Sequence, residues 1–252
     1  MIISIIQARA GSSRLPGKVL IKIQDKTVLH HVVSRVACSK YIDDTFVATT
    51  ILEKDLKVVE ECSNNGFRVF CGSENDVLDR YYQIAKIIKP QHIVRITADC
   101  PVIDPNIIDL VIKEHIESNA DYTSNTLEVP YPDGQDVEVF SFYALKKAWE
   151  NAILASEREH VTPFIKFNEN NFKIHKVFSN KELSKMRWTL DEKEDLDLIK
   201  IFYEKLYKKN NFFSMKDILN LIEREPDLLN INNMHIREAG YFKSLENDYH
   251  VK

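Results

Sequence analysis

The stretch MIISIIQARAGSSRLPGKVL, residues 1–20, decides the fold class. Its apolar start has the length of a strand, and it lacks the basic leader of a signal peptide. The loop that follows has no acidic residue, its glycines and serines can expose backbone N–H groups, and Pro16-Gly17 favours a turn. Its cations are Arg9, Arg14 and Lys18. A basic loop with free amides at the end of a strand is typical of a polyphosphate site in an α/β sheet.

Outward from this loop, short apolar runs alternate with amphipathic stretches. Strands are predicted at residues 1–7, 45–50, 67–71 and 92–98. Helices are predicted at residues 28–37, with Thr27 as N-cap, and at 53–64, 76–88 and 105–117. This alternation predicts a mostly parallel sheet covered by helices on both faces.

The pattern changes after Asn119. Strands of mixed direction are predicted at residues 120–125, 137–140 and 172–178. Helices are predicted at residues 145–154, 157–167, 191–207 and 215–223. The sequence after Pro226 predicts no particular element. We expect one domain, residues 1–252, with an irregular second half built onto the sheet.

Composition excludes several classes of protein. Of the 252 residues, 44% are apolar and 29% are charged, which is typical of a soluble globular chain. The net charge of −4 argues against a general nucleic-acid binder. No apolar run reaches the roughly 18 residues of a membrane span, so we expect no membrane partner and a cytoplasmic protein. Four cysteines without CxxC spacing predict reduced, mostly buried thiols at Cys38, Cys62, Cys71 and Cys100.

Two common phosphate-binding loops do not fit. A P-loop needs GxxxxGK[ST] leading into a helix, but Ser12 stands at its first glycine and Val19 at its Ser/Thr. The GxGxxG fingerprint of a dinucleotide-binding fold is absent from the sequence. The chain therefore resembles neither a P-loop NTPase nor a hydride-transfer enzyme.

The loop instead resembles that of sugar nucleotidyltransferases, in which R-x-x-S-x-R-x-P-G-K follows the first strand. The matching residues are Arg9, Ser12, Arg14, Pro16, Gly17 and Lys18. The wording IIQARAGSSRLPGKVL is similar to the SpsF-type cytidylyltransferases of surface-polysaccharide synthesis, relatives of the CMP-Kdo and acylneuraminate synthetases. The resemblance continues, up to about residue 199, in NDVLDRYYQIA, RITADCPVIDP, DGQDVEVF and RWTLDEKEDL.

This resemblance implies a three-layer nucleotide-diphospho-sugar transferase fold, Rossmann-like and of GT-A type, with a mostly parallel central sheet. Residues 1–118 would bind the nucleotide, and residues 119–252 would bind the acceptor and add the C-terminal helices. The implied activity is Mg²⁺-dependent transfer of CMP from CTP to a sugar acid, with release of pyrophosphate. A homodimer is also implied.

The resemblance also assigns a nucleotide site. Its residues would be Ala8, Arg9, Gly11, Ser12, Ser13, Arg14, Lys18, Arg80 and Thr97. Lys18 and Arg14 would act in catalysis by steadying the pyrophosphate that leaves. For Arg80 a second interpretation stays open, an ion pair with Asp76 one helical turn earlier.

Asp99 and Asp191 are the candidate metal ligands and the other catalytic residues. Asp99 directly follows a predicted buried strand, and both match a metal-binding Asp of the related synthetases. Mg²⁺ takes few protein carboxylates besides phosphate oxygens. Each Asp could instead cap a turn or helix, a role that Asp104 before Pro105 fits better than Asp99. Asp195 and Asp197 are interpreted as surface charges on a helix.

The candidate acceptor residues are Asp136, Glu138, His160 and Arg187. Asp136 and Glu138 alternate with valines, so we expect them on one face of a strand after a turn at Asp133-Gly134. His160 could be a general base or a helix-surface residue. Arg187 could meet a substrate carboxylate, because the guanidinium fork suits that geometry.

Three other functions compete with this one. A glycosyltransferase of the same fold would carry an Asp-x-Asp motif at a strand end, but the match at residues 195–197 lies in a predicted helix. A nucleotidyltransferase acting on a sugar phosphate would give a CDP-linked product. A binding protein without chemistry is disfavoured by the intact Lys18, Asp99 and Asp191.

Overall fold

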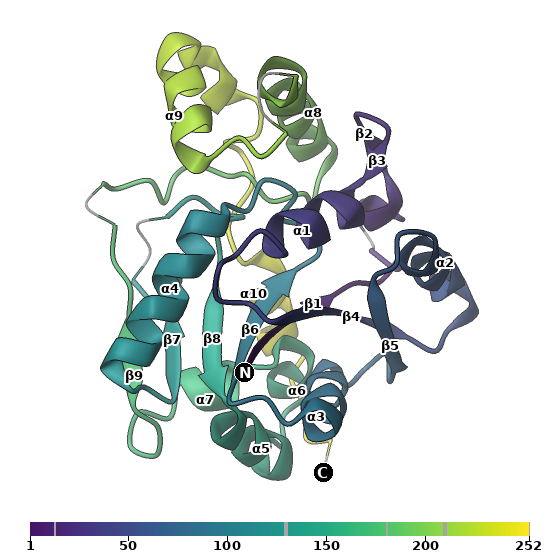
Figure 1. Cartoon of the computed structure of the whole chain (residues 1–252), viewed down its shortest axis with the longest axis vertical. Helices are drawn as coiled ribbons and strands as arrows, with labels where there is room; N and C mark the ends of the chain where they lie inside the picture. Colours follow the sequence, from purple (N-terminus) through teal and green to yellow (C-terminus); the bar gives the residue numbers. More distant parts are fainter. Residues whose placement is uncertain (13, 129–130, 180, 209–210, 252) are drawn as a thin grey trace.

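A seven-stranded sheet forms the centre of the computed structural model, which describes residues 1–12, 14–128, 131–179, 181–208 and 211–251 (Figure 1). The strand order is β5-β4-β1-β6-β8-β7-β9. Its strands are β1 (Ile2–Gln7), β4 (Asp44–Thr50), β5 (Arg68–Gly72), β6 (His92–Thr97), β7 (Tyr122–Ser124), β8 (Glu138–Ser141) and β9 (Ile174–Lys176). A separate hairpin consists of β2 (Lys22–Ile23) and β3 (Lys26–Thr27).

The two halves of the sheet differ in direction. Strands β5, β4, β1 and β6 are parallel neighbours, with Gln7 of β1 level with Ala48 and Thr97. Strand β8 is antiparallel to both β6 and β7, and β9 is parallel to β7. The predicted parallel half and the mixed second half are both confirmed. The carboxyl ends of β1, β4 and β6 therefore meet at one edge, where their loops can build a site.

Helices cover both faces of the sheet. The α-helices are α1 (Val28–Val36), α2 (Leu56–Asn64), α3 (Val77–Ile88), α4 (Pro105–Ser118), α5 (Phe142–Asn151), α6 (Ala155–His160), α7 (Pro163–Lys166), α8 (Lys193–Phe202), α9 (Met215–Arg224) and α10 (Ala239–Glu246). Short 3₁₀ helices occupy Lys18–Leu20, Glu53–Asp55 and Pro226–Asn230, and a π-helical turn, Tyr203–Tyr207, continues α8.

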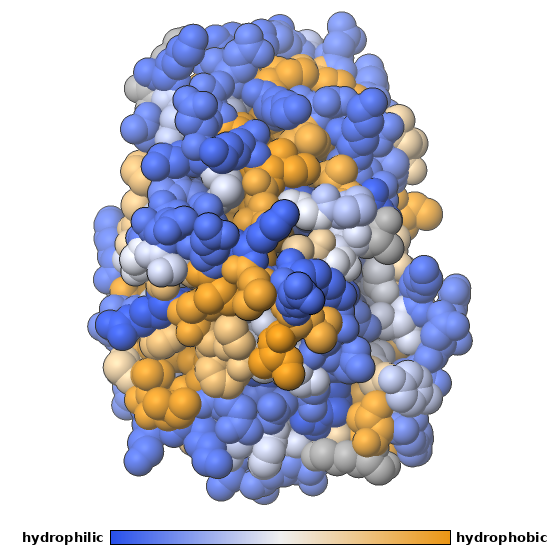
Figure 2. Space-filling model, turned by 90° about the vertical axis from the view of Figure 1, so that its right-hand side faces the viewer, coloured by the Kyte–Doolittle hydropathy of each residue, from blue (hydrophilic) through white to orange (hydrophobic). Residues whose placement is uncertain are grey.

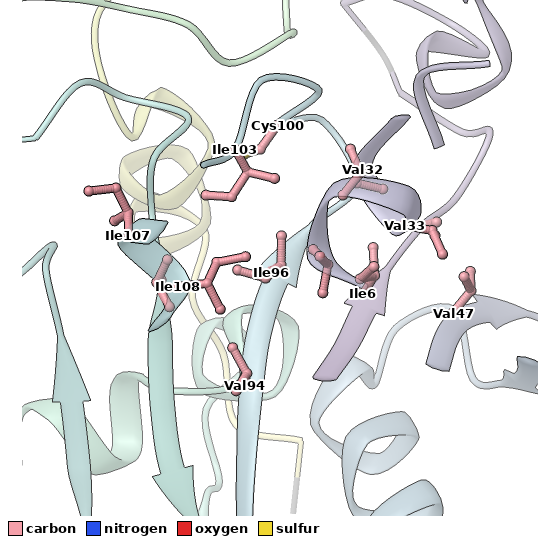
Figure 3. Packing of buried hydrophobic residues seen from close by; sticks show 14 of the residues in the cluster. Ile6, Val32, Val33, Val47, Val94, Ile96, Cys100, Ile103, Ile107 and Ile108 are labelled. Carbon is pink, nitrogen blue, oxygen red and sulfur yellow. The ribbon is translucent and has the colours of Figure 1, made fainter. Parts of the chain in front are cut away.

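Three apolar clusters hold these layers together. One joins β1 and β6 to α1 and α4, with Ile6 and Ile96 facing Val32 and Ile108 (Figure 3). A second packs α3, α5 and α7 against the opposite face of the same strands. A third lies beside the sheet between the β2–β3 hairpin, α8 and α9, around the buried Trp188. The structure is therefore the expected α/β sandwich of three layers, with α8 and α9 as an addition.

Polar residues end or start several helices as predicted. Thr27 Oγ1 accepts from the His30 amide at the start of α1, and Asp104 caps α4 before Pro105. The predicted continuous helix 157–167 is wrong, because the chain breaks at Val161, whose φ is +71°. Such a φ is rare for a β-branched residue and indicates local strain.

Two other helix boundaries differ from prediction. Helix α5 starts at Phe142, because Ser141 accepts a hydrogen bond from Ala144 N and caps it there. Helix α8 starts at Lys193, not at residue 191. The four cysteines are free thiols, but only Cys62 and Cys100 are buried, so the prediction that most are buried was wrong for the other two.

The sequence after Pro226, for which no element was predicted, is largely ordered against the second half. After its 3₁₀ helix it reaches α10, which contacts α6 behind the sheet in Figure 1. The Ala155 amide then donates to Tyr249 O at 2.9 Å, and Val251 N donates to Ile153 O at 2.8 Å. We call residues 226–251 the tail.

The surface at the β5 edge of the sheet exposes many apolar side chains. Seen from the side on which β5 and α2 lie in Figure 1, apolar side chains gather across the middle, between more hydrophilic ends (Figure 2). Ile51, directly after β4, is 71% exposed, and Leu56, the first residue of α2, is 58% exposed. Within the described ranges, every helix is too short or too polar to span a bilayer.

Candidate active site

Lys18 lies at the centre of an ion cluster at the carboxyl edge of the sheet. Its Nζ is 2.6 Å from Asp99 Oδ2 and 2.7 Å from Asp191 Oδ1. Lys18 belongs to the first loop, Asp99 lies two residues after the end of β6, and Asp191 lies two residues before α8. The structure thus brings together three residues that are up to 173 positions apart.

The charges in this cluster stabilise one another. Burial alone would lower the pKa of Lys18, but Asp99 and Asp191 outweigh it and raise that pKa above its usual value. Burial alone would raise the pKa of Asp99, but Lys18 lowers it to about 2. Lys18 and Asp99 are therefore charged at neutral pH, and the carboxylates of Asp99 and Asp191 both contact the Lys18 ammonium.

Arg14 and Arg187 extend the cluster around Asp191. Arg14 lies 3.0 Å from Asp191 Oδ2 and 3.2 Å from Glu192, while Arg187 donates to Asp191 at 3.2 Å. The interpretation of Asp191 as a helix N-cap is wrong, because Glu192 is the N-cap residue of α8. The capping carboxylate is that of Asp195, which accepts from the amides of Asp191 and Glu192 at 2.9 Å each.

Arg187 is buried among three carboxylates. Its Nε and Nη2 donate to Asp195 at 2.9 and 3.0 Å, and its Nη1 donates to Asp133 at 2.8 Å. Burial alone would lower the pKa of Arg187, but these carboxylates raise it. The guanidinium of Arg187 thus has acidic partners within the chain, and its contact with a substrate carboxylate stays a prediction. The interpretation of Asp195 as a surface charge is wrong, because it is fully buried.

The Asp133-Gly134 turn packs directly on the chain beside Arg187. Gly134 has φ of +99°, and a Cβ there would lie 2.6 Å from the backbone of Trp188 and Thr189. Trp188 N donates to Asp133 O at 2.6 Å across this contact. The predicted turn is confirmed, and only glycine allows the close approach that brings Asp133 to Arg187.

Asp55 holds the first loop in place, although the sequence did not lead us to expect it. Its Oδ1 accepts from the Ala10 amide at 2.6 Å, and its Oδ2 accepts from the Thr50 hydroxyl. The Ala10 carbonyl in turn accepts from Ser12 N and Gly17 N. Asp55 is fully buried, and it lies five residues after the end of β4. An acidic residue just beyond a buried strand was the signal that could have identified it.

The other predicted nucleotide residues surround this loop. Ala8 is buried and its amide donates to Ala48 O, whereas Gly11 is exposed beside the Lys54 side chain. Arg9 lies 3.6 Å from Glu159. The Ser12 hydroxyl accepts from Leu15 N at 3.3 Å. Ser13 lies outside the described residues.

Thr97 and Arg80, the last two predicted nucleotide residues, contact the residues and strands next to the ion cluster. Thr97 Oγ1 lies 3.2 Å from Cys100 Sγ and hydrogen-bonds Asp99, which helps to lower the pKa of that carboxyl. Arg80 is buried and donates to Ala48 O at 2.9 Å. Its predicted ion pair with Asp76 is wrong, because Asp76 instead accepts from Arg158 Nε at 2.7 Å. A contact of Arg80 with a nucleotide stays a prediction.

A second polar cluster lies on the face of the sheet that α3 and α5 cover. Glu138 is buried and accepts from Arg95, from Tyr122 at 2.5 Å and from Thr162 at 2.6 Å. Burial alone would raise the pKa of Glu138, but Arg95 lowers it. Arg95 Nε also donates to the Gln7 side chain at 3.1 Å. This cluster thus reaches the end of β1 from the second half of the chain.

Asp136 and His160 contact the tail. Arg237 forms an ion pair with Asp136 and donates to Tyr131 O at 2.9 Å. His160 Nε2 lies 3.0 Å from Ser244 Oγ, and its burial, followed by Arg95, lowers its pKa to about 4. The helix-surface interpretation of His160 is wrong. A role for the neutral imidazole as a general base stays a prediction.

This sheet, with a basic loop and two carboxylates at its carboxyl edge, defines an α/β transferase of the nucleotide-binding kind. The family model described as cytidylyltransferase matches residues 3–220, and the chain belongs to that family. It is accordingly a CTP-dependent nucleotidyltransferase. The recognised resemblance and the fold class are both confirmed, and the glycosyltransferase and binding-protein interpretations lose their basis.

Individual relatives agree with this assignment. The spore coat polysaccharide biosynthesis protein SpsF of Bacillus subtilis is 34% identical over 90% of this chain and 95% of its own. A solved cytidylyltransferase from Leptospira borgpetersenii is 33% identical, with a TM-score of 0.86 over 90% of this chain and 96% of that one. A 3-deoxy-manno-octulosonate cytidylyltransferase of Solibacter usitatus is 35% identical over 44% of this chain and 43% of its own.

Proposed function

We propose that the protein transfers CMP from CTP to a sugar acid and releases pyrophosphate, with Mg²⁺ bound by Asp99 and Asp191. The observation that carries the proposal is the single cation, Lys18 Nζ, held between these two carboxylates at 2.6 and 2.7 Å. Both carboxylates thus already converge on one positive charge beside a basic loop suited to phosphates.

The donor set suits a magnesium ion. Cytidylyltransferases of this family generally depend on a divalent metal. Asp99 and Asp191 offer oxygen ligands, and Mg²⁺ binds through one or two carboxylates together with substrate phosphates. In the described part of the chain, no three or more His, Cys, Asp or Glu side chains are arranged so that they could hold a metal ion by themselves, which is consistent with such a sparse protein ligand set. When bound, the ion would supply charge neutralisation to the triphosphate.

The protein's own residues would act by position and charge. The Lys18 ammonium and the Arg14 guanidinium, both of which now contact Asp191, would stabilise the negative charge that develops on the pyrophosphate as it leaves. Asp55 would keep the backbone of the first loop in the conformation that receives the phosphates. The acceptor hydroxyl would then attack the α-phosphorus of CTP along a fixed line.

The second polar cluster, around Glu138, would receive the acceptor together with Asp136 and His160. A sugar acid is favoured because the Solibacter relative is named for 3-deoxy-manno-octulosonate, itself a sugar acid. Asp136 and Glu138 would bind its hydroxyls, and His160, with its pKa of about 4, would be a neutral base at pH 7. A cytoplasmic location and a homodimer also belong to this proposal, with the apolar face at the β5 edge as a surface that a second copy could cover.

The test is a screen of the four nucleoside triphosphates against sugar acids and sugar phosphates, with pyrophosphate release as the readout. We expect CTP with a sugar acid, and no other combination, to release pyrophosphate at a rate that depends on Mg²⁺. Preference for UTP or ATP would contradict the choice of nucleotide. Turnover of sugar phosphates alone would give a CDP-linked product and contradict the acceptor.

A further inference from the structure

The tail lies beyond the family match, which ends at residue 220, yet it contacts the chain next to Asp191 and the proposed acceptor residues. Asn232 is buried and donates to the Arg187 carbonyl at 2.9 Å and to Asp195 at 2.8 Å. His235 lies 3.1 Å from Glu194. The tail is thereby attached to the chain that positions Asp191.

One face of α10 and its flanks is polar and points inward. Tyr241 and Ser244 lie three residues apart on one side of α10, and Arg237 and Asp248 lie just outside its two ends; all four are partly buried. Each has a partner in the acceptor half, and these partners are Asp136, His160, Glu159 and Ser156. Helix α10 itself buries no residue completely. It is therefore attached through polar contacts and not by an apolar core.

The inward partners are the residues already proposed to meet the acceptor. Arg237 forms an ion pair with Asp136 and also donates to Tyr131 O, so it contacts both this side chain and the backbone near it. Ser244 donates to Glu159 at 3.0 Å, and Glu159 in turn lies 3.6 Å from Arg9 of the first loop. The tail is thus linked to the acceptor residues and, through Glu159, to the nucleotide loop.

The backbone at this contact is strained. Val161, between His160 and Thr162, has φ of +71°, and Glu238, just before α10, has φ of +57°. Strained non-glycine residues cluster at binding and catalytic sites, where the surrounding structure holds them. Here they flank the inward face of the tail and the residues that it contacts.

We infer that residues 231–248 form the outer wall of the acceptor site and that Arg237 positions Asp136 to bind hydroxyls of the sugar acid. This inference rests on the proposed function. It assigns a role to a part of the chain that the family match does not cover, and it makes Arg237 a positioning residue of the acceptor half.

The test compares Arg237→Gln and Arg237→Lys with a matched control, Arg224→Gln, in the full-length protein. Arg224 lies on α9, and its Nε donates to Asn220 O of its own helix. The wild-type enzyme is first assayed with CTP, Mg²⁺ and 3-deoxy-manno-octulosonate as the probe acid, or with whichever other sugar acid of the screen it turns over fastest. For Arg237→Gln we expect the KM for the acid to rise about tenfold or more, because a charge-assisted contact is lost.

A change in the KM for the acid without a change in the KM for CTP identifies Arg237 as a positioning residue of the acceptor site. The KM for CTP should stay within about twofold in Arg237→Gln, Arg237→Lys should recover part of the acid's KM, and Arg224→Gln should match the wild type. An unchanged KM for the acid, or equal rises of both KM values, would overturn the role of Arg237. A wild-type enzyme that turns over no sugar acid would instead overturn the proposed acceptor, and this inference with it.

Discussion

The nucleotide edge and the acceptor side of this molecule are built in different ways. At the nucleotide edge, Lys18 lies in the loop that follows β1, and Asp99 lies two residues after β6, the parallel neighbour of β1, so the sheet brings the two together. On the acceptor side, Asp136 and His160 take their partners from the tail, about 101 and 84 positions further along the chain. The geometry of the nucleotide edge depends on the order of the strands, whereas that of the acceptor side depends on whether the tail packs against it.

This difference predicts where mutations act. Lys18 and Asp99 lie on a framework that many apolar contacts stabilise, so their replacement should change activity more than stability. The acceptor side, and the Arg187–Asp195 network between it and Asp191, are held by buried ion pairs and polar contacts, where loss of one partner leaves a charge unpaired. Substitutions in several parts of the molecule test this contrast. The expected changes, in the free energy of unfolding or in transition-state stabilisation, range from several kcal/mol to about one.

Asp195→Ala should destabilise the protein by about 3–5 kcal/mol, because it leaves the buried Arg187 without its two-oxygen partner. It also removes the acceptor of Asn232 and the cap of α8. Asp197→Ala, an exposed neighbour on the same helix, should stay within about 0.5 kcal/mol of wild type. Denaturant unfolding of both variants measures this. Equal stability of the two variants would contradict a structural role for the network.

Lys18→Ala should lower kcat/KM by about 2–4 kcal/mol in transition-state stabilisation, which is roughly 30- to 1,000-fold. The fold should survive, since Asp55 and the backbone hydrogen bonds of residue 18, which alanine keeps, still hold the loop. Lys22→Ala, an exposed cation four residues later, is the control and should leave turnover unchanged. Steady-state assays decide whether the loop stabilises the leaving pyrophosphate or is only a basic turn. A Lys18→Ala enzyme with normal turnover would reduce it to a basic turn.

His115 joins the two halves and should make the fold sensitive to acid. Its ring lies 2.9 Å from Thr123 Oγ1 of β7 and 2.9 Å from His92 Nδ1 of β6. Burial, followed by His92, lowers its pKa from 6.5 to about 3. Because the unfolded chain binds the proton more tightly, the contribution of His115 to stability is complete above pH 6.5 and is lost as the pH falls toward 3.

His115→Gln should therefore flatten the loss of stability between pH 6.5 and 4.5, by up to about 1.4 kcal/mol for each pH unit. Thermal unfolding of the variant and the wild type across this range measures the effect. His250→Gln, an exposed histidine near the end of the tail, serves as the control. Parallel pH profiles for wild type and His115→Gln would mean that other groups cause the acid sensitivity.

The same contrast explains what the sequence could predict. The positions of the first loop and of Asp99 were predictable because apolar runs mark strands and the residues after parallel strands meet at one edge, and the family resemblance then gave Lys18 and Asp99 their expected roles. The burial of Asp195 and the three-carboxylate setting of Arg187 were missed, because a charged helix start looks the same whether it faces solvent or a buried arginine. Contacts such as that of Arg237 with Asp136 have no local signal, since they depend on how the tail folds back.

The central claim is that Asp99 and Asp191 act together on one Mg²⁺. The direct measurement is the Mg²⁺ dependence of pyrophosphate release from CTP for Asp99→Asn, Asp191→Asn and the double variant. Each single variant should need more Mg²⁺ for half-maximal rate, and the double variant should lose little more activity than the worse single one, because two ligands of one ion act as a unit. Additive losses, or a wild-type Mg²⁺ requirement in Asp191→Asn, would contradict a shared metal site.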